Sequence, residues 1–206
     1  MSGTLIYLMG PSGSGKDSLI NAARPYLAER GCDVMRRVIT RSAESVGEEA
    51  VGVSPEAFES LKQQGAFALH WQANGLGYGV RHAQLAPLAQ GHWVLLNGSR
   101  AYLPEALARF PNLVAVHITA SPQVLRERLL SRGRETREEV EARVQRALAY
   151  TPPPDAASLE VHNDGTLGDA GQRLLSVLED LPGWPRRNVK RSGKLSPIAP
   201  ILSSTP

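Results

Sequence analysis

The amino-acid sequence predicts an α/β fold in which helices cover a mainly parallel β-sheet. Short apolar runs alternate along the chain with longer amphipathic stretches, as in strands joined by helical crossovers. A glycine-rich turn directly follows the first apolar run and leads into the first amphipathic stretch. The 206 residues are 42% hydrophobic and 21% charged, which is enough apolar material to build a core without disulfides or structural metals.

Composition excludes several classes of protein. The single cysteine, Cys32, cannot form an internal disulfide or a multi-thiolate metal site. The first apolar run, residues 5–9, is far too short to cross a bilayer, and residues 1–30 lack the basic flank and cleavage site of a secretory signal. We therefore exclude secreted, membrane-spanning and zinc-ribbon proteins and expect a cytoplasmic protein.

The first predicted elements are two strands and two helices. Residues 4–9 form a buried strand, the helix after the glycine-rich turn runs from about 15 to 30, and residues 34–39 form a second strand. Ser54-Pro55-Glu56 predicts the start of another helix, because serine caps free amides and proline suits the first helical position. That helix should end at Gly65.

A hairpin and the rest of the sheet follow. Residues 66–71 and 75–80 predict two strands around Asn74-Gly75, since Asn-Gly is a strong signal for a two-residue hairpin turn. The remaining strands are expected at 93–96, 113–118 and 159–162, and the remaining helices at 104–110, 122–130, 137–150 and 167–181.

The C-terminal segment, residues 183–206, differs from the rest in charge and composition. Five basic residues and no acid follow Asp180: Arg186, Arg187, Lys190, Arg191 and Lys194. Subtracting this +5 from the net +3 of the whole chain leaves −2 for residues 1–182. The segment is rich in proline and serine and has no periodicity, so we predict that it is mostly disordered. Nucleic acid is therefore not an expected partner of the domain.

A phosphate-binding loop motif lies between the first strand and the first helix. It consists of Gly10, Pro11, Ser12, Gly13, Ser14, Gly15 and Lys16, and Asp17 and Ser18 follow it. In such a loop, glycines let backbone N–H groups turn toward phosphates, the helix adds its positive end, and the lysine reaches the outer phosphates. Because the motif stands between a strand and a helix, residues 10–18 are the predicted nucleotide site.

Asp17 departs from the usual motif, which has a magnesium-binding hydroxyl after the lysine. A carboxylate beside nucleotide phosphates would be repelled unless Mg²⁺ bridged them, which makes Asp17 the candidate metal ligand. In the alternative interpretation, Asp17 only favours the helix N-terminus and Ser18 contacts the phosphates. The sequence leaves both open.

Over residues 4–180 the chain resembles the guanylate-kinase group of nucleotide kinases. Besides the loop, the resemblance rests on Ile39-Thr40-Arg41, on residues 75–79 and on Arg132-Gly133-Arg134-Glu135-Thr136. It implies a P-loop kinase fold with a parallel core sheet and one kinase domain, residues 1–182. It also implies a small acceptor-binding insertion at about 40–85 and an arginine-rich lid at about 131–140.

Two positions argue against GMP as the acceptor. The resemblance aligns Val38 and Leu69 with a serine and a glutamate that read guanine in that group. A buried site that hydrogen-bonds a base cannot simply lose its polar partners. GMP is therefore not the expected acceptor.

Within this group, the chain resembles the ribose 1,5-bisphosphate phosphokinase family. Three segments carry the resemblance: the loop with its Asp17, Ala73-Asn74-Gly75-Leu76 with Tyr78-Gly79, and Asn97-Gly98-Ser99-Arg100. The resemblance implies that ATP, with Mg²⁺, phosphorylates ribose 1,5-bisphosphate to 5-phosphoribosyl 1-diphosphate. It also implies a place in phosphonate breakdown.

Seven arginines and five glutamates lie between residues 126 and 146. Arg126, Arg128 and Arg137 are expected to pair with glutamates at i,i+3 and i,i+4 helical spacing. The candidate phosphate ligands are two arginines on a glycine turn and two on one helix face: Arg132, Arg134, Arg143 and Arg146. Since phosphoryl transfer needs positive charge around the oxygens, Lys16, Arg132, Arg134 and Arg143 form the predicted catalytic set.

Five residues are the candidate acceptor ligands. By resemblance, Arg41 and Tyr78 hold the acceptor phosphate. Asn97, Ser99 and Arg100 follow a core strand at its carboxyl end, where open parallel sheets bind ligands. In the alternative, these residues serve as surface charge, packing and helix cap. The attacking phosphate oxygen is already ionised, so we expect no general base.

Two other functions remain open. A nucleoside monophosphate kinase is the enzymatic alternative, and a catalytically dead binding module is the alternative of another class. The sequence also leaves a homodimer open.

Further expectations concern single residues. We expect that Cys32 is half-buried, that Trp71 and Trp93 pack in the interior, that the five histidines bind no metal and that Asn163-Asp164 lies near the adenine.

Overall fold

The structure is a computed structural model that describes residues 3–41, 50–133, 135–153 and 158–186. Within these residues the chain forms two compact units. The first contains the segment that ends at Gly10, together with Cys32–Val116 and Thr151–Ser158. The second contains Pro11–Gly31, His117–Tyr150 and the residues from Leu159 onward. Each unit therefore combines segments that lie far apart in the sequence.

A five-stranded sheet has the order β2-β7-β1-β8-β9. Three of its strands belong to the first unit: β1 (Leu5–Met9), β2 (Cys32–Val34) and β7 (Trp93–Asn97). β7 lies between β1 and β2 and runs parallel to both, with Leu5 opposite Val94. Every residue of β1 and β7 is buried, as expected where a parallel sheet is covered on both faces. The predicted parallel core sheet is confirmed.

The single strand predicted at 34–39 is wrong, because the structure divides it into two strands of different sheets. β2 ends at Val34, and β3 (Arg37–Ile39) belongs to a second sheet of the first unit, with the order β4-β3-β6-β5. At the crossing, the Met35 amide still bonds Leu95 O, whereas the Arg36 amide donates to the Gln84 side chain. The apolar run therefore continues across a change of sheet that periodicity cannot reveal.

The second sheet contains the predicted hairpin. β5 (Phe67–Ala73) pairs antiparallel with β6 (Leu76–Arg81) across Asn74 and Gly75, whose φ angles are 51° and 74°. Two positive φ angles in succession define the hairpin turn that Asn-Gly favours. β4 (Ala50–Gly52), which the sequence did not predict, runs parallel to β3 at the edge of this sheet.

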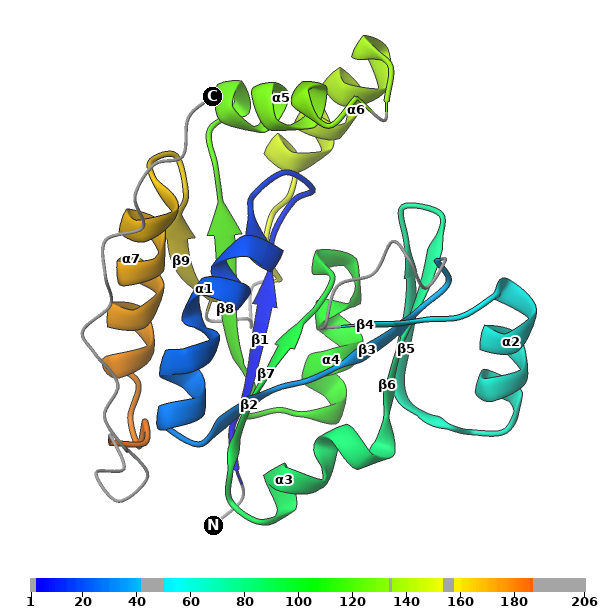
Figure 1. Cartoon of the computed structure of the whole chain (residues 1–206), viewed down its shortest axis with the longest axis vertical. Helices are drawn as coiled ribbons and strands as arrows, with labels where there is room; N and C mark the ends of the chain where they lie inside the picture. The colour runs from blue at the N-terminus through cyan, green and yellow to red at the C-terminus, as the bar shows by residue number, and fades with distance from the viewer. Residues whose placement is uncertain (1–2, 42–49, 134, 154–157, 187–206) are drawn as a thin grey trace. The chain divides into compact units, whose positions relative to one another are not determined.

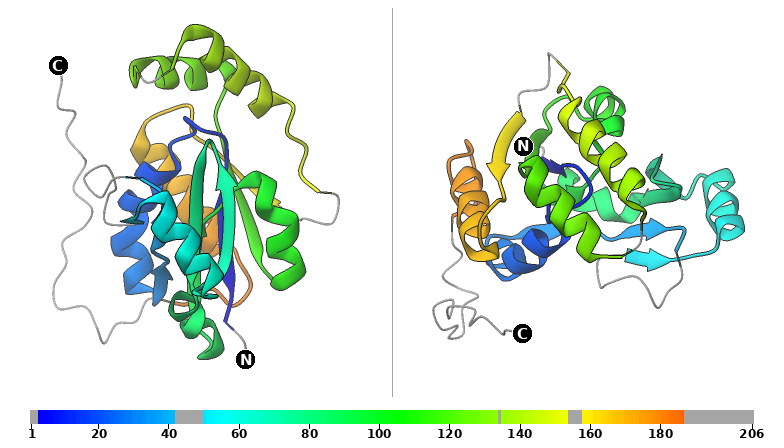
Figure 2. Two further views of the ribbon diagram at one scale, coloured as in Figure 1. Left: turned by 90° about the vertical axis from the view of Figure 1, so that its right-hand side faces the viewer. Right: turned by 90° about the horizontal axis from the view of Figure 1, so that it is seen from above.

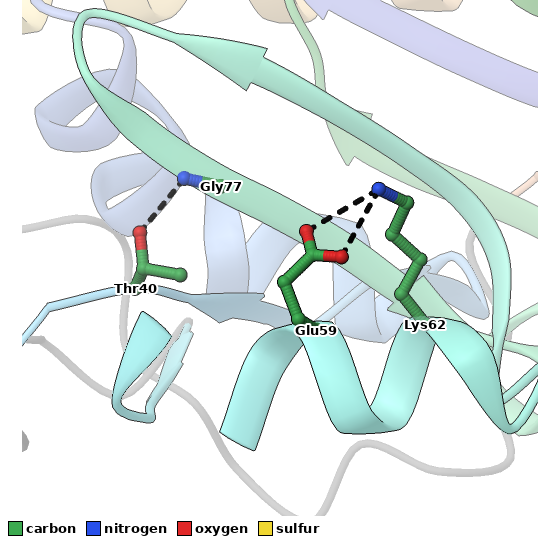
Figure 3. A network of polar contacts seen from close by, with 4 residues as sticks. All are labelled: Thr40, Glu59, Lys62 and Gly77. Atoms are coloured by element: carbon green, nitrogen blue, oxygen red, sulfur yellow. Dashed lines mark hydrogen bonds and ion pairs between the residues drawn. The ribbon is translucent and has the colours of Figure 1, made fainter. Parts of the chain in front are cut away.

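Helix α2 (Pro55–Gln63) covers one face of the second sheet. As predicted, the Ser54 side chain caps it by accepting from the Ala57 amide, and Gly65 follows it with a φ of 66°. Its Phe58 packs with Val38 and Phe67 in one buried cluster. Figure 3 shows a side-chain bond that holds β3 to β6, from the Gly77 amide to Thr40 Oγ1 (2.7 Å), and the exposed Glu59–Lys62 ion pair on α2.

The rest of the first unit connects these sheets. A short helical turn (His82–Leu85) and α3 (Ala86–Ala89) lead from β6 to β7. After β7, a 3₁₀ turn (Arg100–Tyr102) and α4 (Leu103–Arg109) lead to β8 (Val114–Thr119), which runs from the first unit into the second.

In the second unit, α1 (Lys16–Glu29) and α7 (Leu167–Glu179) lie side by side (Figure 1). Both Tyr26 Oη (2.6 Å) and Arg30 Nη2 (3.0 Å) on the α1 side bind Glu179 Oε1 at the end of α7. Trp184, in the segment predicted to be mostly disordered, is only 9% exposed. Residues 187–206 lie outside the described residues.

Helices α5 (Pro122–Ser131) and α6 (Arg137–Leu148) form an apolar pair in the second unit, visible in Figure 1 and Figure 2. Leu125 and Leu129 of α5 pack against two valines of α6. Thr136 and Glu139 cap α6 reciprocally, each side chain bonding the other's backbone amide. β9 (Ser158–His162) completes the described elements.

Cys32 is 2% exposed rather than half-buried, because β2 lies beside the buried β7. Burial raises the pKa of its thiol to about 12. Trp71 and Trp93 are buried, as expected. None of the helices in the described ranges combines the length and apolar character needed to span a membrane.

Candidate active site

The phosphate-binding loop of the second unit has the conformation that its glycines predict. Gly13 and Gly15 have φ angles of 89° and 84°, in the left-handed region that favours glycine. Between them, the Ser14 amide bonds Pro11 O at 3.2 Å. Gly15 then caps α1 without a side-chain hydrogen bond, and the N-terminus of a helix is a favourable place for an anion. The loop therefore has the form of an anion-binding backbone turn.

Two neighbouring segments hold the loop in place. The Asn163 side chain, 3% exposed, donates from Nδ2 to Ser14 O at 2.7 Å. A Cβ on Gly15 would lie only 2.4 Å from that nitrogen, and one on Gly13 would lie 3.3 Å from Leu129 Cγ. Close approach, as well as positive φ, thus requires glycine at both positions. Asn163 was expected near the adenine, and here it bonds the loop backbone.

The polar side chains of the loop point to phosphate and metal chemistry. Lys16 Nζ donates to Pro11 O at 3.0 Å. Ser14 Oγ is buried and has no hydrogen-bond partner within the described residues. Asp17 and Ser18 are both exposed in the first turn of α1. No group of three histidine, cysteine, aspartate or glutamate side chains in the described ranges could hold a metal by itself. This donor set suits a Mg²⁺ ion shared with nucleotide phosphates, not a protein cage.

Arg143 reaches the loop from α6. Its Nη1 donates to Ser12 Oγ at 3.1 Å, and its Nη2 lies 2.7 Å from Glu135 Oε1. Both side chains of this ion pair are mostly buried, at 22% and 17% exposed. Glu135 therefore orients the guanidinium, which places positive charge directly at the loop.

The expected pairing of Arg128 within its own helix is wrong. Arg128 Nη1 is buried without a hydrogen-bond partner within the described residues, and it would lie 3.7 Å from a Cβ on Gly15. It sits next to Leu129 on the side of α5 that packs on the loop, where solvent does not reach its terminal nitrogen. A buried, unpartnered guanidinium nitrogen beside a phosphate loop is a candidate phosphate ligand that the sequence missed.

Arg126 does form an ion pair, but with Glu141 of the facing α6, not with a glutamate of its own helix. Hydrogen bonding to Glu141 raises the pKa of Arg126 and lowers that of Glu141. Three further arginines of this region, Arg132, Arg137 and Arg146, are exposed. Arg134 lies outside the described residues. The structure thus brings Arg143 to the loop and leaves the roles of Arg132, Arg134 and Arg146 as predictions.

In the first unit, Tyr7 fixes the backbone at the carboxyl end of β7. Its hydroxyl donates to Ser99 O (2.8 Å) and accepts from the Ser99 amide (2.9 Å). Gly98 makes this possible, because a Cβ there would lie 2.1 Å from Tyr7 Cζ. The ends of two neighbouring strands therefore position the segment Asn97–Ser99. Tyr7 looked like an ordinary core residue in an apolar run.

Aromatic and cationic side chains meet at the predicted acceptor residues. Tyr78 stacks on Trp71 (5.5 Å between ring centres, 5° between planes), and Trp71 stacks on Tyr102 (5.3 Å). Burial raises the pKa of the Tyr102 phenol. Arg37 lies with its guanidinium 5.5 Å from the Tyr78 ring centre, and its Nη1 donates to Asn97 O at 3.0 Å. The sequence singled out Tyr78 and Asn97 but not Arg37.

The other acceptor candidates are placed as follows. Arg41 is exposed just after β3, with its amide bonded to Ile39 O. Arg100 is half-buried at the start of the turn after β7. Leu69 is 1% exposed on the strand that carries Trp71. Val38, the other aligned position, lies in the buried cluster under α2.

Comparison with solved structures identifies the fold. Guanylate kinase from Anaplasma phagocytophilum matches 86% of this chain and 85% of its own, with a TM-score of 0.62 at 20% identity. A sugar kinase from Janibacter matches 89% of this chain and 99% of its own, with a TM-score of 0.51 at 16% identity. The predicted P-loop kinase fold is confirmed. A scan against protein-family models found no match.

Curated relatives are much more similar in sequence. Ribose 1,5-bisphosphate phosphokinase PhnN of Pseudomonas paraeruginosa is 53% identical over 178 residues, which are 86% of this chain and 96% of that protein. The proteins of the same name from Pseudomonas fluorescens and Burkholderia pseudomallei are 52% and 45% identical, covering 87% and 86% of this chain and 96% of each relative. With about half its residues shared over nearly the whole length of these relatives, the chain belongs to the ribose 1,5-bisphosphate phosphokinase family.

Proposed function

We propose that this protein transfers the γ-phosphoryl group of ATP to the 1-phosphate of ribose 1,5-bisphosphate, giving ADP and 5-phosphoribosyl 1-diphosphate in phosphonate breakdown. The observation that carries the proposal is the 53% identity to a protein named for this activity, over 96% of that protein's length. The retained loop lysine and the contact between Arg143 and Ser12 support an active kinase over a dead binding module.

On the donor side, the loop backbone and Lys16 bind the ATP phosphates. Ser14 Oγ and Arg128 Nη1 are buried beside the loop without hydrogen-bond partners within the described residues, so a bound phosphate would satisfy both. Asp17 would hold the Mg²⁺ ion, which would neutralise negative charge on the nucleotide phosphates. The exposed position of Asp17 next to Lys16 supports this role.

The reaction requires positioning and charge, without a proton to remove. An oxygen of the 1-phosphate forms a bond to the γ-phosphorus as the bond from that phosphorus to the β–γ bridging oxygen breaks, and ADP leaves with this oxygen. The acceptor is an ionised phosphate, so the charges of products and reactants balance without a general base. Lys16, Arg132, Arg134 and Arg143 stabilise the charge on the transferring group.

On the acceptor side, Arg41, Tyr78, Asn97, Ser99 and Arg100 contact the sugar bisphosphate. The clearest support for these contacts is the backbone at Ser99, which the two hydrogen bonds of the Tyr7 hydroxyl hold in place. A backbone fixed in this way orients hydrogen-bond donors at the end of the strand. The acceptor insertion (about 40–85) and the lid (about 131–140) belong to a kinase domain of residues 1–182.

The test is an ATP-consumption assay with Mg²⁺, in which ribose 1,5-bisphosphate and GMP are offered separately and the products are followed by phosphorus NMR. We expect ADP and a new diphosphate at carbon 1 with the sugar, and no GDP with GMP. Turnover of GMP alone would contradict the proposal and favour a nucleoside monophosphate kinase. A variant with Lys16→Met should abolish the sugar reaction, which excludes a contaminating kinase.

A further inference from the structure

Trp71 lies beside the acceptor candidate Tyr78 with both faces of its indole covered. It is 7% exposed, and it stacks on Tyr78 (5.5 Å between ring centres, 5° between planes) and on Tyr102 (5.3 Å, 23°). Tyr78 belongs to β6, which pairs with β5 on one side, whereas β5 is the edge strand on its other side. Tyr102 comes from the turn after β7, outside that sheet. The indole is therefore sandwiched between two phenol rings.

The register of the second sheet places this sandwich on the face away from α2. Trp71 lies directly opposite Tyr78, and Tyr78 lies directly opposite Ile39. Since side chains alternate along a strand, these three share one face, while Val38 packs in the cluster on the other face, under α2. The indole is thus not part of the core between the sheet and α2, and its burial comes from the two tyrosines.

Both tyrosines have contacts besides the indole. Tyr78 pairs with Ile39 in the sheet, and the guanidinium of Arg37 lies over its ring, 5.5 Å from the ring centre. The Tyr102 side chain forms a hydrogen bond with the His70 backbone. Because neither ring depends on the indole alone for its position, removing the indole should leave a slot bounded by two aromatic rings.

Such a slot suits a purine base. Indole and purine are both flat systems of one five-membered and one six-membered ring, and proteins bind bases by stacking them on aromatic faces. β3 and β5 flank β6, so Arg37 and Trp71 approach the Tyr78 ring from opposite sides. The faces of Tyr78 and of Trp71 on which a base could stack are therefore covered by the chain itself.

We propose that Trp71 determines acceptor specificity: its indole fills a slot that fits a purine base, and thereby excludes nucleoside monophosphates in favour of a base-free sugar phosphate. The inference rests on the proposed function, because it takes Tyr78 to contact the acceptor. The motifs assigned no such role to Trp71, which the sequence predicted only to pack in the interior.

The test is a calorimetric titration of GMP into the wild type and Trp71→Ala, with the donor site saturated by ADP and Mg²⁺. The variant should bind GMP about tenfold more tightly or better, which is the gain expected from stacking one base on an aromatic side chain. Free indole should weaken GMP binding to the variant, because small apolar molecules refill an engineered cavity. Equal binding of GMP by both proteins, or binding that indole does not affect, would overturn the proposal.

Three further variants complete the test. Phe58→Ala removes a buried aromatic side chain from the cluster on the other face of the sheet and should bind GMP no better than the wild type. Trp71→Phe keeps a ring against Tyr78 and should bind GMP less than about threefold more tightly than the wild type. If Trp71→Ala does not fold, Trp71→Val, which suits a strand better, replaces it.

Kinetics connects the slot to the acceptor. With Trp71→Ala, GMP should compete with ribose 1,5-bisphosphate, raising its apparent KM without changing kcat, and the wild type should be insensitive to the same GMP concentration. Inhibition that is not competitive with the sugar would contradict the proposal. The calorimetry does not need turnover: if ribose 1,5-bisphosphate is not a substrate but GMP binds only to the variant, the proposed function fails and the slot stands.

Discussion

The two units of the molecule hold positive charge in different ways. In the second unit, Lys16, Arg128 and Arg143 lie around a loop whose own backbone is the anion-binding element. In the first unit, Arg37 stands on a sheet, braced by a carbonyl and an aromatic ring. A triphosphate, common to many kinases, is suited to a continuous backbone loop. We expect the acceptor, which differs between kinases, to be bound instead by side chains that individual strands supply.

The largest effect should come from the loop lysine. Lys16→Met removes the one charged side chain of the loop motif, and we expect kcat/KM to fall by about 10³-fold or more, as when a charge that stabilises a phosphoryl transition state is lost. Steady-state kinetics with ribose 1,5-bisphosphate measures it. A loss below tenfold would show that the backbone alone carries the donor side.

Arg143 and Arg137 form a matched pair on the same helix. Arg143→Met loses the contact to Ser12 and leaves Glu135 without its partner, so kcat should fall by about 10²-fold. Arg137 is exposed, and Arg137→Met should change kcat less than about twofold. Similar losses in both variants would mean that general positive charge near the loop matters, not a positioned guanidinium.

On the acceptor side, the sharpest structural requirement is the glycine beside Tyr7. In Gly98→Ala, the new Cβ would meet Tyr7 Cζ at 2.1 Å, and either the ring or the strand end must move. We expect the free energy of unfolding to fall by about 2–3 kcal/mol, as for overpacking in a core.

Gly171→Ala provides the control for this substitution. No atom lies within 4 Å of a Cβ at Gly171, which is inside α7, so alanine should raise the unfolding free energy by about 0.5–1 kcal/mol. Chemical denaturation of the two variants measures the difference. A tolerated Gly98→Ala would remove the argument that Tyr7 fixes the acceptor-side backbone.

The smallest effect concerns the thiol in the first unit. Burial raises the pKa of Cys32 from 9.0 to about 12, so between these values the folded chain keeps a proton that the unfolded chain has lost. Stability from this group is therefore fully present below pH 9 and falls as pH rises toward 12, by about 1.4 kcal/mol per pH unit. Denaturation of the wild type and Cys32→Ala at pH 8 and pH 10 isolates this slope. Parallel pH dependence of the two proteins would contradict it.

The comparison also explains what the sequence could predict. The loop motif is contiguous, so its position, glycines and helix were read directly, and Ser54, Asn74 and Gly75 marked a helix start and a hairpin through local chemistry. Arg37 and Tyr7 gave no such signal, because their roles depend on register and on partners about 40 and 90 residues away. The role of Arg128 was predicted wrongly, because the spacing of arginines and glutamates around it is also the spacing of ion pairs on a solvent-exposed helix. Val38 was aligned with a base-reading serine by resemblance alone, and alignment does not reveal that its side chain packs under α2.

The chain passes from one sheet to the other at Met35, and the strand pairings of these two sheets constrain the order of folding. In the second sheet, β5 and β6 are joined by two residues, and such a hairpin can form in about 1–10 μs. In the central sheet, β1 and β2 both pair with β7, so Leu5 must find Val94 and Cys32 must find Trp93. Long-range pairing of this kind is slow, and during synthesis it cannot begin before residues 93–97 have left the ribosome. The β5–β6 hairpin is thus synthesised before the central sheet can form. β1 and β2 are synthesised earlier still, but they can pair only after β7 has been synthesised.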